Sequence, residues 1–194
     1  GWYSGGDSTY NKITRDYIFN KLVEFGLDNE HTETFSYSPG TGFAQLPGTG
    51  YNVIGELGSG SKVIVVGAHR DSPGRDLSGR VSVIPAAIDN GAGTVTVMEM
   101  ARVFAAKCKE FLNQNDYKVI FILFDSEELY LLGSEAYVAS HSLSNVQYYL
   151  NFDCPSGYRE DVAILSWVTD NKLSSATDDC SSRFALPMQK TFSN

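Results

Sequence analysis

Long apolar runs, an excess of basic residues and a dense set of cysteines are all missing from this sequence of 194 residues. No apolar run approaches the length of about 20 residues that a membrane-spanning helix needs, so we expect no membrane span. The formal net charge of -8 argues against a nucleic-acid partner, because phosphate binding requires a basic surface. The first residues lack the basic and then apolar pattern of a signal peptide, but a processed chain would lack it too, so export stays undecided.

Cysteine and histidine are both scarce, with three of each. The cysteines are Cys108, Cys154 and Cys180, and their spacing matches neither a zinc-binding motif nor a disulfide framework. One disulfide with one free thiol, or three thiols, would fit them equally well. The redox compartment is therefore not predicted.

What is present is the composition of a globular domain, with 42% hydrophobic residues and 18 glycines that provide many tight turns. The length suits one domain with a substantial core. Helix patterns run from a cap at Asp7 or Ser8 to Phe25, over residues 92–109, after Gly133 with Ser134 as the cap, and over residues 172–184. Strand patterns cover residues 32–37, 51–57, 62–66, 119–124, 146–152 and 161–167.

These elements alternate without repeats or an obvious linker, which predicts an α/β fold. We expect a three-layer α/β/α sandwich around a mixed, largely parallel β-sheet, with an antiparallel hairpin near its start. The glycine-rich residues 58–61 are the predicted turn of that hairpin.

The chain is organised around residues 117–128, where six consecutive apolar residues stop at three carboxylates, Asp125, Glu127 and Glu128. A run that short, rich in β-branched and aromatic residues, predicts a strand buried on both faces, as in parallel sheets. Ligands of such sheets bind beyond the carboxyl ends of the strands, which is where these acids fall. An isolated Glu-Glu pair would be better explained as a solvated turn, so the interpretation depends on how the other strands end.

Two other apolar runs end in the same way, one at His69 and Asp71 and another at Asp153. Asp89 lies in an Asp-Asn-Gly turn directly before the long helix. A single histidine or a single such turn is more often structural, but together they direct one imidazole and several carboxylates to one edge of the sheet. That ligand set suits zinc and related divalent ions, which would also offset the repulsion among the carboxylates.

Four motifs occur in the order and approximate spacing of a known family. They are Gly-Ala-His-Arg-Asp-Ser at residues 67–72, Ala-Ile-Asp-Asn-Gly-Ala-Gly at 87–93, Asp-Ser-Glu-Glu at 125–128 with Gly-Ser at 133–134, and Asn-Phe-Asp at 151–153. From about Tyr3 to its last residue the sequence resembles the zinc-dependent exopeptidase family that includes bacterial leucyl aminopeptidase, glutamate carboxypeptidase and glutaminyl cyclase. The resemblance implies a mixed-sheet α/β/α fold.

The resemblance also implies two zinc ions bridged by one carboxylate. Matched residue by residue, His69 and Asp153 would bind the first zinc, and Glu128 would bind the second. Asp89 would bridge the two ions. The family pattern requires one more ligand, a histidine on the second zinc well downstream of Asp153, and this sequence has none there.

The other two histidines, His31 and His141, both precede Asp153 and match no position in that pattern. We therefore expect residues 1–194 to form a single zinc-exopeptidase catalytic domain that is incomplete at its C-terminus. With three protein ligands at the first position and two at the second, we expect the chain to hold at most one zinc tightly.

By the same resemblance, Glu127 would be the general base and acid, and Asp71 would orient His69, as a carboxylate beside a ligating histidine commonly does. The expected function is hydrolysis of N-terminal residues from peptides or small aminoacyl substrates. Two alternatives stay open: a single-zinc glutaminyl cyclase, and a relative without catalysis that acts as a binding domain. The resemblance slightly favours a secreted or lumenal protein, while the role of Asp125, the side-chain preference and the oligomeric state are not predicted.

Overall fold

The computed structural model describes residues 9–42, 44, 46–72, 86–155, 163–166, 171–185 and 188–191. The chain divides into two compact units, residues 1–153 and residues 154–194. The prediction of one domain over residues 1–194 stays a prediction, and each unit is described by itself.

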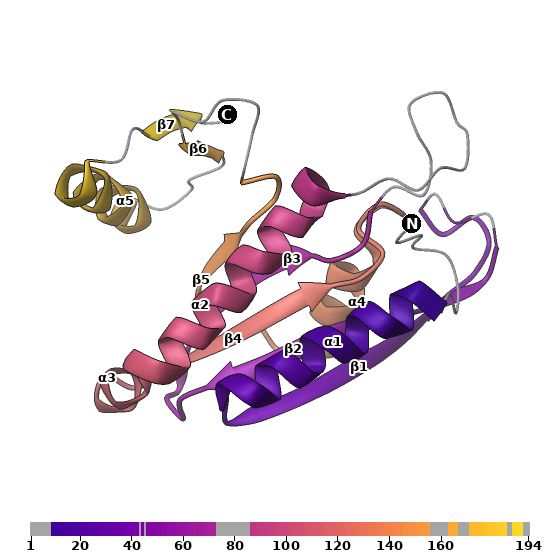
Figure 1. Ribbon diagram of the computed structural model, residues 1–194, viewed down its shortest axis with the longest axis horizontal. Coiled ribbons are helices and arrows are strands. Elements are labelled where there is room, and N and C mark those ends of the chain that lie inside the picture. Colours follow the sequence, from indigo (N-terminus) through magenta and orange to yellow (C-terminus); the bar gives the residue numbers. More distant parts are fainter. Residues whose placement is uncertain are drawn as a thin grey trace. The chain divides into compact units, whose positions relative to one another are not determined.

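The first unit is built on a five-stranded sheet (Figure 1). Its strands are β1 (Asn29–Tyr37), β2 (Gly48–Leu57), β3 (Lys62–His69), β4 (Tyr117–Phe124) and β5 (Val146–Asn151), in the spatial order β1-β2-β4-β3-β5. The pairs β1/β2 and β2/β4 are antiparallel, whereas β4/β3 and β3/β5 are parallel. The predicted mixed sheet is confirmed, and its parallel half comprises the three strands that end in the predicted site.

The predicted hairpin between the second and third strands is wrong. β2 and β3 do not pair, because β4 lies between them. The backbone N–H of Gly60 donates to the carbonyl of Tyr117 at 3.2 Å, and that of Lys62 donates to the carbonyl of Asp116 at 3.1 Å, so the turn bonds to the start of β4. β4, the most apolar strand, takes the position between β2 and β3 that is covered from both sides. The antiparallel hairpin near the start of the chain is formed by β1 and β2.

Helices cover both faces of the sheet. In Figure 1, α1 (Thr9–Phe25) and α2 (Gly93–Lys107) lie in front of the strands and α4 (Leu132–Ser140) lies behind them. One buried cluster joins Leu22 of α1 and Val97 of α2 to Phe121, and a second cluster joins Tyr137 of α4 to Ile122. Phe121 and Ile122 are both 0% exposed, so the three-layer arrangement and the strand buried on both faces are confirmed.

Most predicted helices are present, with shifted ends. α1 ends at Phe25 as predicted, and Gly26 follows with φ of 76°. The proposed caps Asp7 and Ser8 lie outside the described residues. The long helix corresponds to α2, which follows a π-helical segment η1 (Ala87–Ala92) and precedes α3 (Lys109–Gln114).

The helix after β4 begins at Leu132, earlier than expected, and Ser134 is not its cap. The Ser134 hydroxyl donates instead to the carbonyl of Leu131 at 3.0 Å. Gly133 lies in this first turn, where an added Cβ would meet the Asp125 carbonyl and the Asn52 side chain. The helix therefore packs directly on the end of β4, and this contact sets where it starts.

The second unit contains β6 (Ala163–Ser166), α5 (Asn171–Phe184) and β7 (Met188–Thr191), and β6 pairs with β7 in parallel. The helix predicted over residues 172–184 is confirmed, and the predicted strand is confirmed over residues 163–166, while residues 161, 162 and 167 lie outside the described residues. β7 was not predicted, because its four residues carry little apolar alternation.

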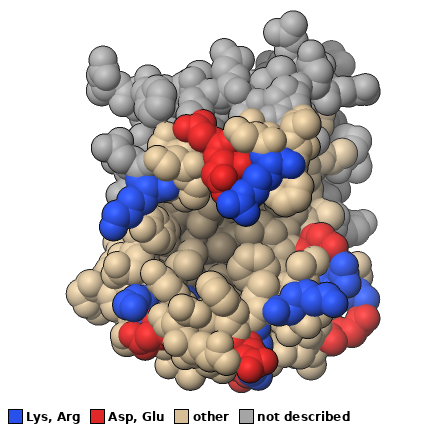
Figure 2. All heavy atoms as spheres, turned by 90° about the vertical axis from the view of Figure 1, so that its left-hand side faces the viewer, with Lys and Arg blue, Asp and Glu red and all other residues tan. Residues whose placement is uncertain are grey.

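Several charged side chains of the described residues form ion pairs on the surface. Figure 2 shows one face on which Lys and Arg side chains lie beside Asp and Glu side chains rather than forming a continuous basic surface. Ion pairs such as Arg102 with Glu99 at 2.6 Å and Lys118 with Glu56 at 2.7 Å are of this kind. In the described part of the chain, no helix is both long enough and apolar enough to cross a bilayer.

Candidate metal centre

The parallel half of the sheet brings three strand ends to one edge. His69, the last residue of β3, is in register with Phe124 at the end of β4, and Gly67 is in register with Asn151 at the end of β5. The loops that leave these strands therefore start side by side. This is the convergence that the sequence predicted.

The imidazole of His69 is the hub of this edge. Its Nε2 lies 3.2 Å from Asp89 Oδ1, 3.3 Å from Asp153 Oδ1 and 3.9 Å from Glu127 Oε2. The His69 side chain is 3% exposed, whereas those of Asp89, Asp153 and Glu127 are 50%, 48% and 32% exposed. The site is therefore a cup with the histidine at its base and the carboxylates around its rim.

Glu128 completes a possible ligand set. One ligand atom from each of His69, Asp89 and Glu128 lies within 4.8 Å of the other two. Oε1 of Glu128 is buried and has no hydrogen-bond partner among the described residues. A buried carboxylate oxygen without a donor is costly, and an imidazole with several carboxylates is a donor set that suits zinc. The residues present therefore fit a zinc ion.

The pKa values of the two glutamates of the cup are raised, because they are partly buried and face too little positive charge. Burial, together with the nearby Asp89 and Asp71 carboxylates, raises the pKa of Glu128 to about 7. Burial also raises the pKa of Glu127, against the influence of His69. Burial lowers the pKa of His69, but the neighbouring carboxylates, above all Asp153 and Asp71, outweigh it and raise that pKa to about 11. A bound cation would remove this strain by stabilising the carboxylates and the neutral imidazole.

Asp71 connects the histidine strand to the glutamate loop. Its Oδ1 lies 3.5 Å from His69 Nδ1, which is long for a hydrogen bond. The two oxygens of Asp71 accept the backbone N–H groups of Glu127 at 3.0 Å and Glu128 at 3.1 Å. Asp71 thus lies behind His69 on the side away from the rim carboxylates, where it holds the glutamate loop in place.

Asn90, which sequence reasoning passed over, fixes the segment that carries Asp89. Its side-chain oxygen accepts the N–H of Gly93 at 3.0 Å, and its amide nitrogen donates to the carbonyl of Phe152 at 2.9 Å. An added Cβ on Gly93 would meet the carbonyl of Phe152 and the side chain of Asn90. The start of α2 is thereby attached to the residue next to Asp153. The Asp-Asn-Gly turn was the available signal, because asparagine there commonly bonds to nearby backbone.

Asp125 is buried in a polar network and does not lie on the rim of the cup. It is 0% exposed and pairs with the equally buried Arg70, with 2.7 Å between Asp125 Oδ2 and the Arg70 guanidinium. It also accepts the backbone N–H of Tyr51 at 2.8 Å and the side-chain amide of Asn11 at 3.1 Å. Arg70 and Asn11 were missed because neither residue type, taken alone, signals a buried network.

A small pocket of about 120 Å³ adjoins the cup. His69, Glu127 and Asp153 form its polar side, and Phe124 and Tyr149 belong to its apolar side. The arrangement places room for an apolar group next to the predicted ligands and the predicted base.

Comparison with known proteins agrees with the sequence resemblance. Residues 52–194 match the model of peptidase family M28. Leucine aminopeptidase 2 of Arthroderma otae is 34% identical over 152 residues, which cover 66% of this chain and 28% of that protein. Leucine aminopeptidase 1 of Leptosphaeria maculans is 36% identical over 84 residues, which cover 43% of this chain and 21% of that protein. The chain thus spans only about a quarter of the length of these curated relatives.

Solved structures show the same fold. A Zn-dependent exopeptidase from Parabacteroides distasonis superposes with a TM-score of 0.73 at 18% identity, covering 98% of this chain and 72% of that one. Glutaminyl cyclase from Porphyromonas gingivalis superposes with a TM-score of 0.77 at 13% identity, covering 98% of this chain and 71% of that one. At such identities the likeness establishes the α/β architecture alone.

Proposed function

Because the chain belongs to peptidase family M28, we propose that it supplies the zinc site of a metallo-aminopeptidase, which removes N-terminal residues from peptides. The observation that carries this proposal is the cup around His69. Three carboxylates from three different segments of the chain lie within 3.9 Å of one imidazole nitrogen. The similarity to leucine aminopeptidases supports this choice of reaction.

The sequence resemblance supplies the metal-binding roles in this proposal. His69 and Asp153 would hold the first zinc, Glu128 would hold the second, and Asp89 would contribute to both. When bound, zinc polarises a scissile carbonyl and lowers the pKa of a water molecule toward neutrality. Asp71 keeps the His69 ring oriented, and its bonds to the backbone of Glu127 and Glu128 hold both side chains toward the cup.

Glu127 is the proposed general base and acid. Its carboxylate lies 3.9 Å from His69 Nε2 and is partly exposed, so a water molecule and a substrate can both reach it. It would accept a proton from the attacking water and deliver it to the leaving amine. The raised pKa of its half-buried carboxyl group favours the first transfer, since the conjugate base of a weaker acid takes up a proton more readily.

The second zinc position is short of ligands within the described residues. Glu128 and the shared Asp89 would be its protein ligands among them. His31 and His141 do not contribute, because both line a different pocket. We therefore propose that the 194-residue chain holds one zinc tightly and that a second requires a ligand from outside the described residues.

The test is hydrolysis of a leucine anilide by the full-length protein, measured as isolated, after chelation and after zinc is restored. We expect hydrolysis that chelation abolishes and zinc recovers. Cyclisation of an N-terminal glutaminyl peptide without anilide hydrolysis would favour the cyclase alternative. Absence of both reactions from a folded, zinc-loaded protein would leave a binding domain.

A further inference from the structure

Asp89 differs from His69 and Asp153 in how its backbone is held. His69 ends β3 and Asp153 follows closely on β5, so the sheet places both of them. The backbone N–H of Phe152 donates to the carbonyl of Gly67 at 2.9 Å, which ties the two strand ends together. Asp89 lies outside the sheet, in η1, and its backbone angles of φ -111° and ψ 97° are not helical. Neither a strand nor a regular helix therefore fixes the Asp89 carboxylate beside His69.

Two side chains around the start of α2 attach this segment to both strand ends. The Asn90 amide donates to the carbonyl of Phe152 at 2.9 Å, which is the attachment to the end of β5. The Thr94 hydroxyl donates to the carbonyl of His69 at 3.0 Å, which is the attachment to the end of β3. Asp89 directly precedes Asn90, so one short segment carries the first of these acids and bonds to the backbone next to the other ligands.

Asparagine is chemically suited to this position. The Asn90 oxygen accepts the N–H of Gly93 at 3.0 Å while its nitrogen donates to Phe152, so one short side chain accepts and donates at once. Asn90 is only 1% exposed, and a buried backbone group that loses such a partner is left unsatisfied. An ionised aspartate of nearly the same shape could accept from Gly93 but could not donate to Phe152.

We propose that Asn90 and Thr94 are positioning residues of the metal centre, which hold its first three ligands at the spacing that one zinc requires. These ligands are His69, Asp89 and Asp153, and the inference rests on the zinc site proposed above. His69 Nε2 lies 3.2 Å from Asp89 Oδ1 and 3.3 Å from Asp153 Oδ1. Neighbouring ligands of a tetrahedral zinc lie about 3.3–3.6 Å apart, given metal–ligand bonds of about 2.0–2.2 Å. Such a site must be held to within about 0.5 Å, so a small drift of the Asp89 segment should weaken binding.

The loop that carries the two glutamates has an anchor of its own. Asp71 accepts the backbone N–H groups of Glu127 and Glu128, as described above. The metal centre is thus held from two sides, by Asp71 at the glutamate loop and by Asn90 and Thr94 at the other three ligands. Each anchor can be removed without touching a residue that is proposed to bind zinc.

The experiment measures the zinc affinity of the full-length protein by competition with a chelator, together with thermal unfolding of the zinc-free form. Asn90→Ala and Thr94→Val should each weaken zinc binding roughly 10–100-fold, without changing the number of ions bound at saturation. Thr94→Ser keeps the hydroxyl and should bind zinc like the wild type. A second readout is the visible spectrum of bound Co²⁺, which depends on coordination geometry and should change in Asn90→Ala and in Thr94→Val.

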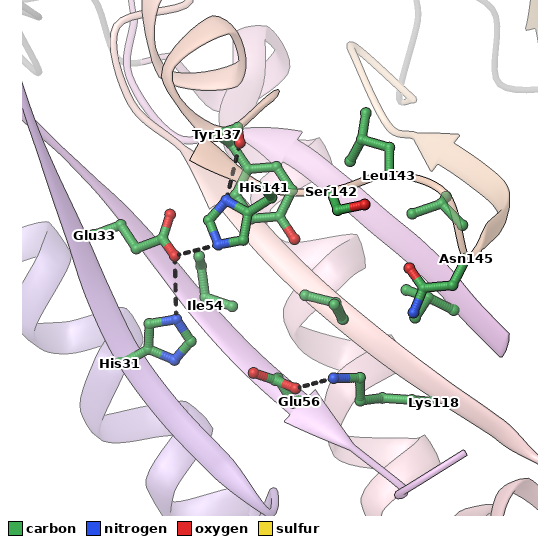
Figure 3. Close-up of a pocket in the computed structure, with 13 residues that line it drawn as sticks. His31, Glu33, Ile54, Glu56, Lys118, Tyr137, His141, Ser142, Leu143 and Asn145 are labelled. Atoms are coloured by element: carbon green, nitrogen blue, oxygen red, sulfur yellow. Dashed lines mark hydrogen bonds and ion pairs between the residues drawn. The ribbon is translucent and has the colours of Figure 1, made fainter. Parts of the chain in front are cut away.

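Two control variants remove similar groups that lie away from these attachments. Thr96→Val removes a hydroxyl of α2 that donates to the carbonyl of Ala92, four residues back, at 2.8 Å. Asn145→Ala removes an amide that donates to the carbonyl of Ser61 at 3.1 Å. Asn145 directly precedes β5 and lines the pocket shown in Figure 3, at the end of that strand away from the metal centre. Both controls should bind zinc like the wild type, whatever their effect on stability.

Wild-type zinc affinity and an unchanged Co²⁺ spectrum in Asn90→Ala and Thr94→Val would overturn the proposal, since these residues would then only stabilise the fold. Equal weakening in the two controls would overturn it as well. Thr94→Val is nearly isosteric, so it decides the question even if Asn90→Ala does not fold. A wild-type protein that binds no zinc would defeat this proposal and the proposed function together. Normal zinc binding without anilide hydrolysis would defeat the proposed function alone.

Discussion

The loop that follows β4 carries two kinds of carboxylate, separated by a single residue. Asp125 is fully buried with Arg70 as a permanent partner, whereas Glu127 and Glu128 face a cup in which several acids share one imidazole. Asp125 therefore has a cation from its own chain, whereas the acids of the cup do not, and we propose that the acids of the cup take a cation from solution.

Glu127→Gln should have the largest effect if this contrast is right. The change keeps the size of the side chain but removes the proposed base, so kcat should fall by about 10²–10⁴-fold with zinc content unchanged. Steady-state hydrolysis with metal analysis of the full-length protein would measure both. Glu128→Gln is the matched comparison, since loss of a ligand should lower zinc content as well as rate. Near-normal turnover of the Glu127→Gln protein would assign the base elsewhere.

Asp125→Asn should affect the fold rather than the metal. It leaves the buried Arg70 guanidinium without its charge partner, which typically lowers the free energy of unfolding by about 3–5 kcal/mol. Chemical denaturation would measure that loss, and replacing Arg70 with Met in the same chain should recover part of it. A stability like that of the wild type, combined with weaker zinc binding, would place Asp125 among the metal-site acids instead.

Asp71→Asn should have a smaller effect than either of these substitutions, because Asp71 lies between the metal-site acids and the buried acids of the fold. Asp71 contacts His69 from behind and accepts two backbone N–H groups of the glutamate loop. Its substitution should weaken zinc binding roughly 10–100-fold without changing the stoichiometry at saturation. Competition with a chelator would measure the affinity. If a whole metal equivalent were lost at saturation, Asp71 would be a direct ligand.

Sequence reasoning could bring most of the candidate ligands together because they follow runs of apolar residues. Buried parallel strands are continuous in sequence, and their ends share one edge, so His69, Glu128 and Asp153 could be expected together. The partners that hold the loops were not predictable in this way. Arg70 and Asn11 are distant in the chain, and nothing in their local pattern distinguishes a buried polar residue from an exposed one.

The order of the strands was only partly predictable for a related reason. Periodicity shows that residues 51–57 and 62–66 form strands, but a short glycine-rich connection between them suggests direct pairing. The pairing depends instead on β4, which is more apolar than either and occurs much later in the chain. A strand that competes for pairing from so far along the chain leaves no signal in the local sequence of β2 and β3.

The insertion of β4 between β2 and β3 also constrains how the protein is made. During synthesis β2 and β3 emerge early, and each must wait with an unpaired edge until residues 117–124 leave the ribosome. Pairings so distant in sequence form slowly, and open apolar edges can associate with other chains in the meantime. We therefore expect the nascent chain to depend on chaperones during this interval, and refolding yield to fall steeply as protein concentration rises.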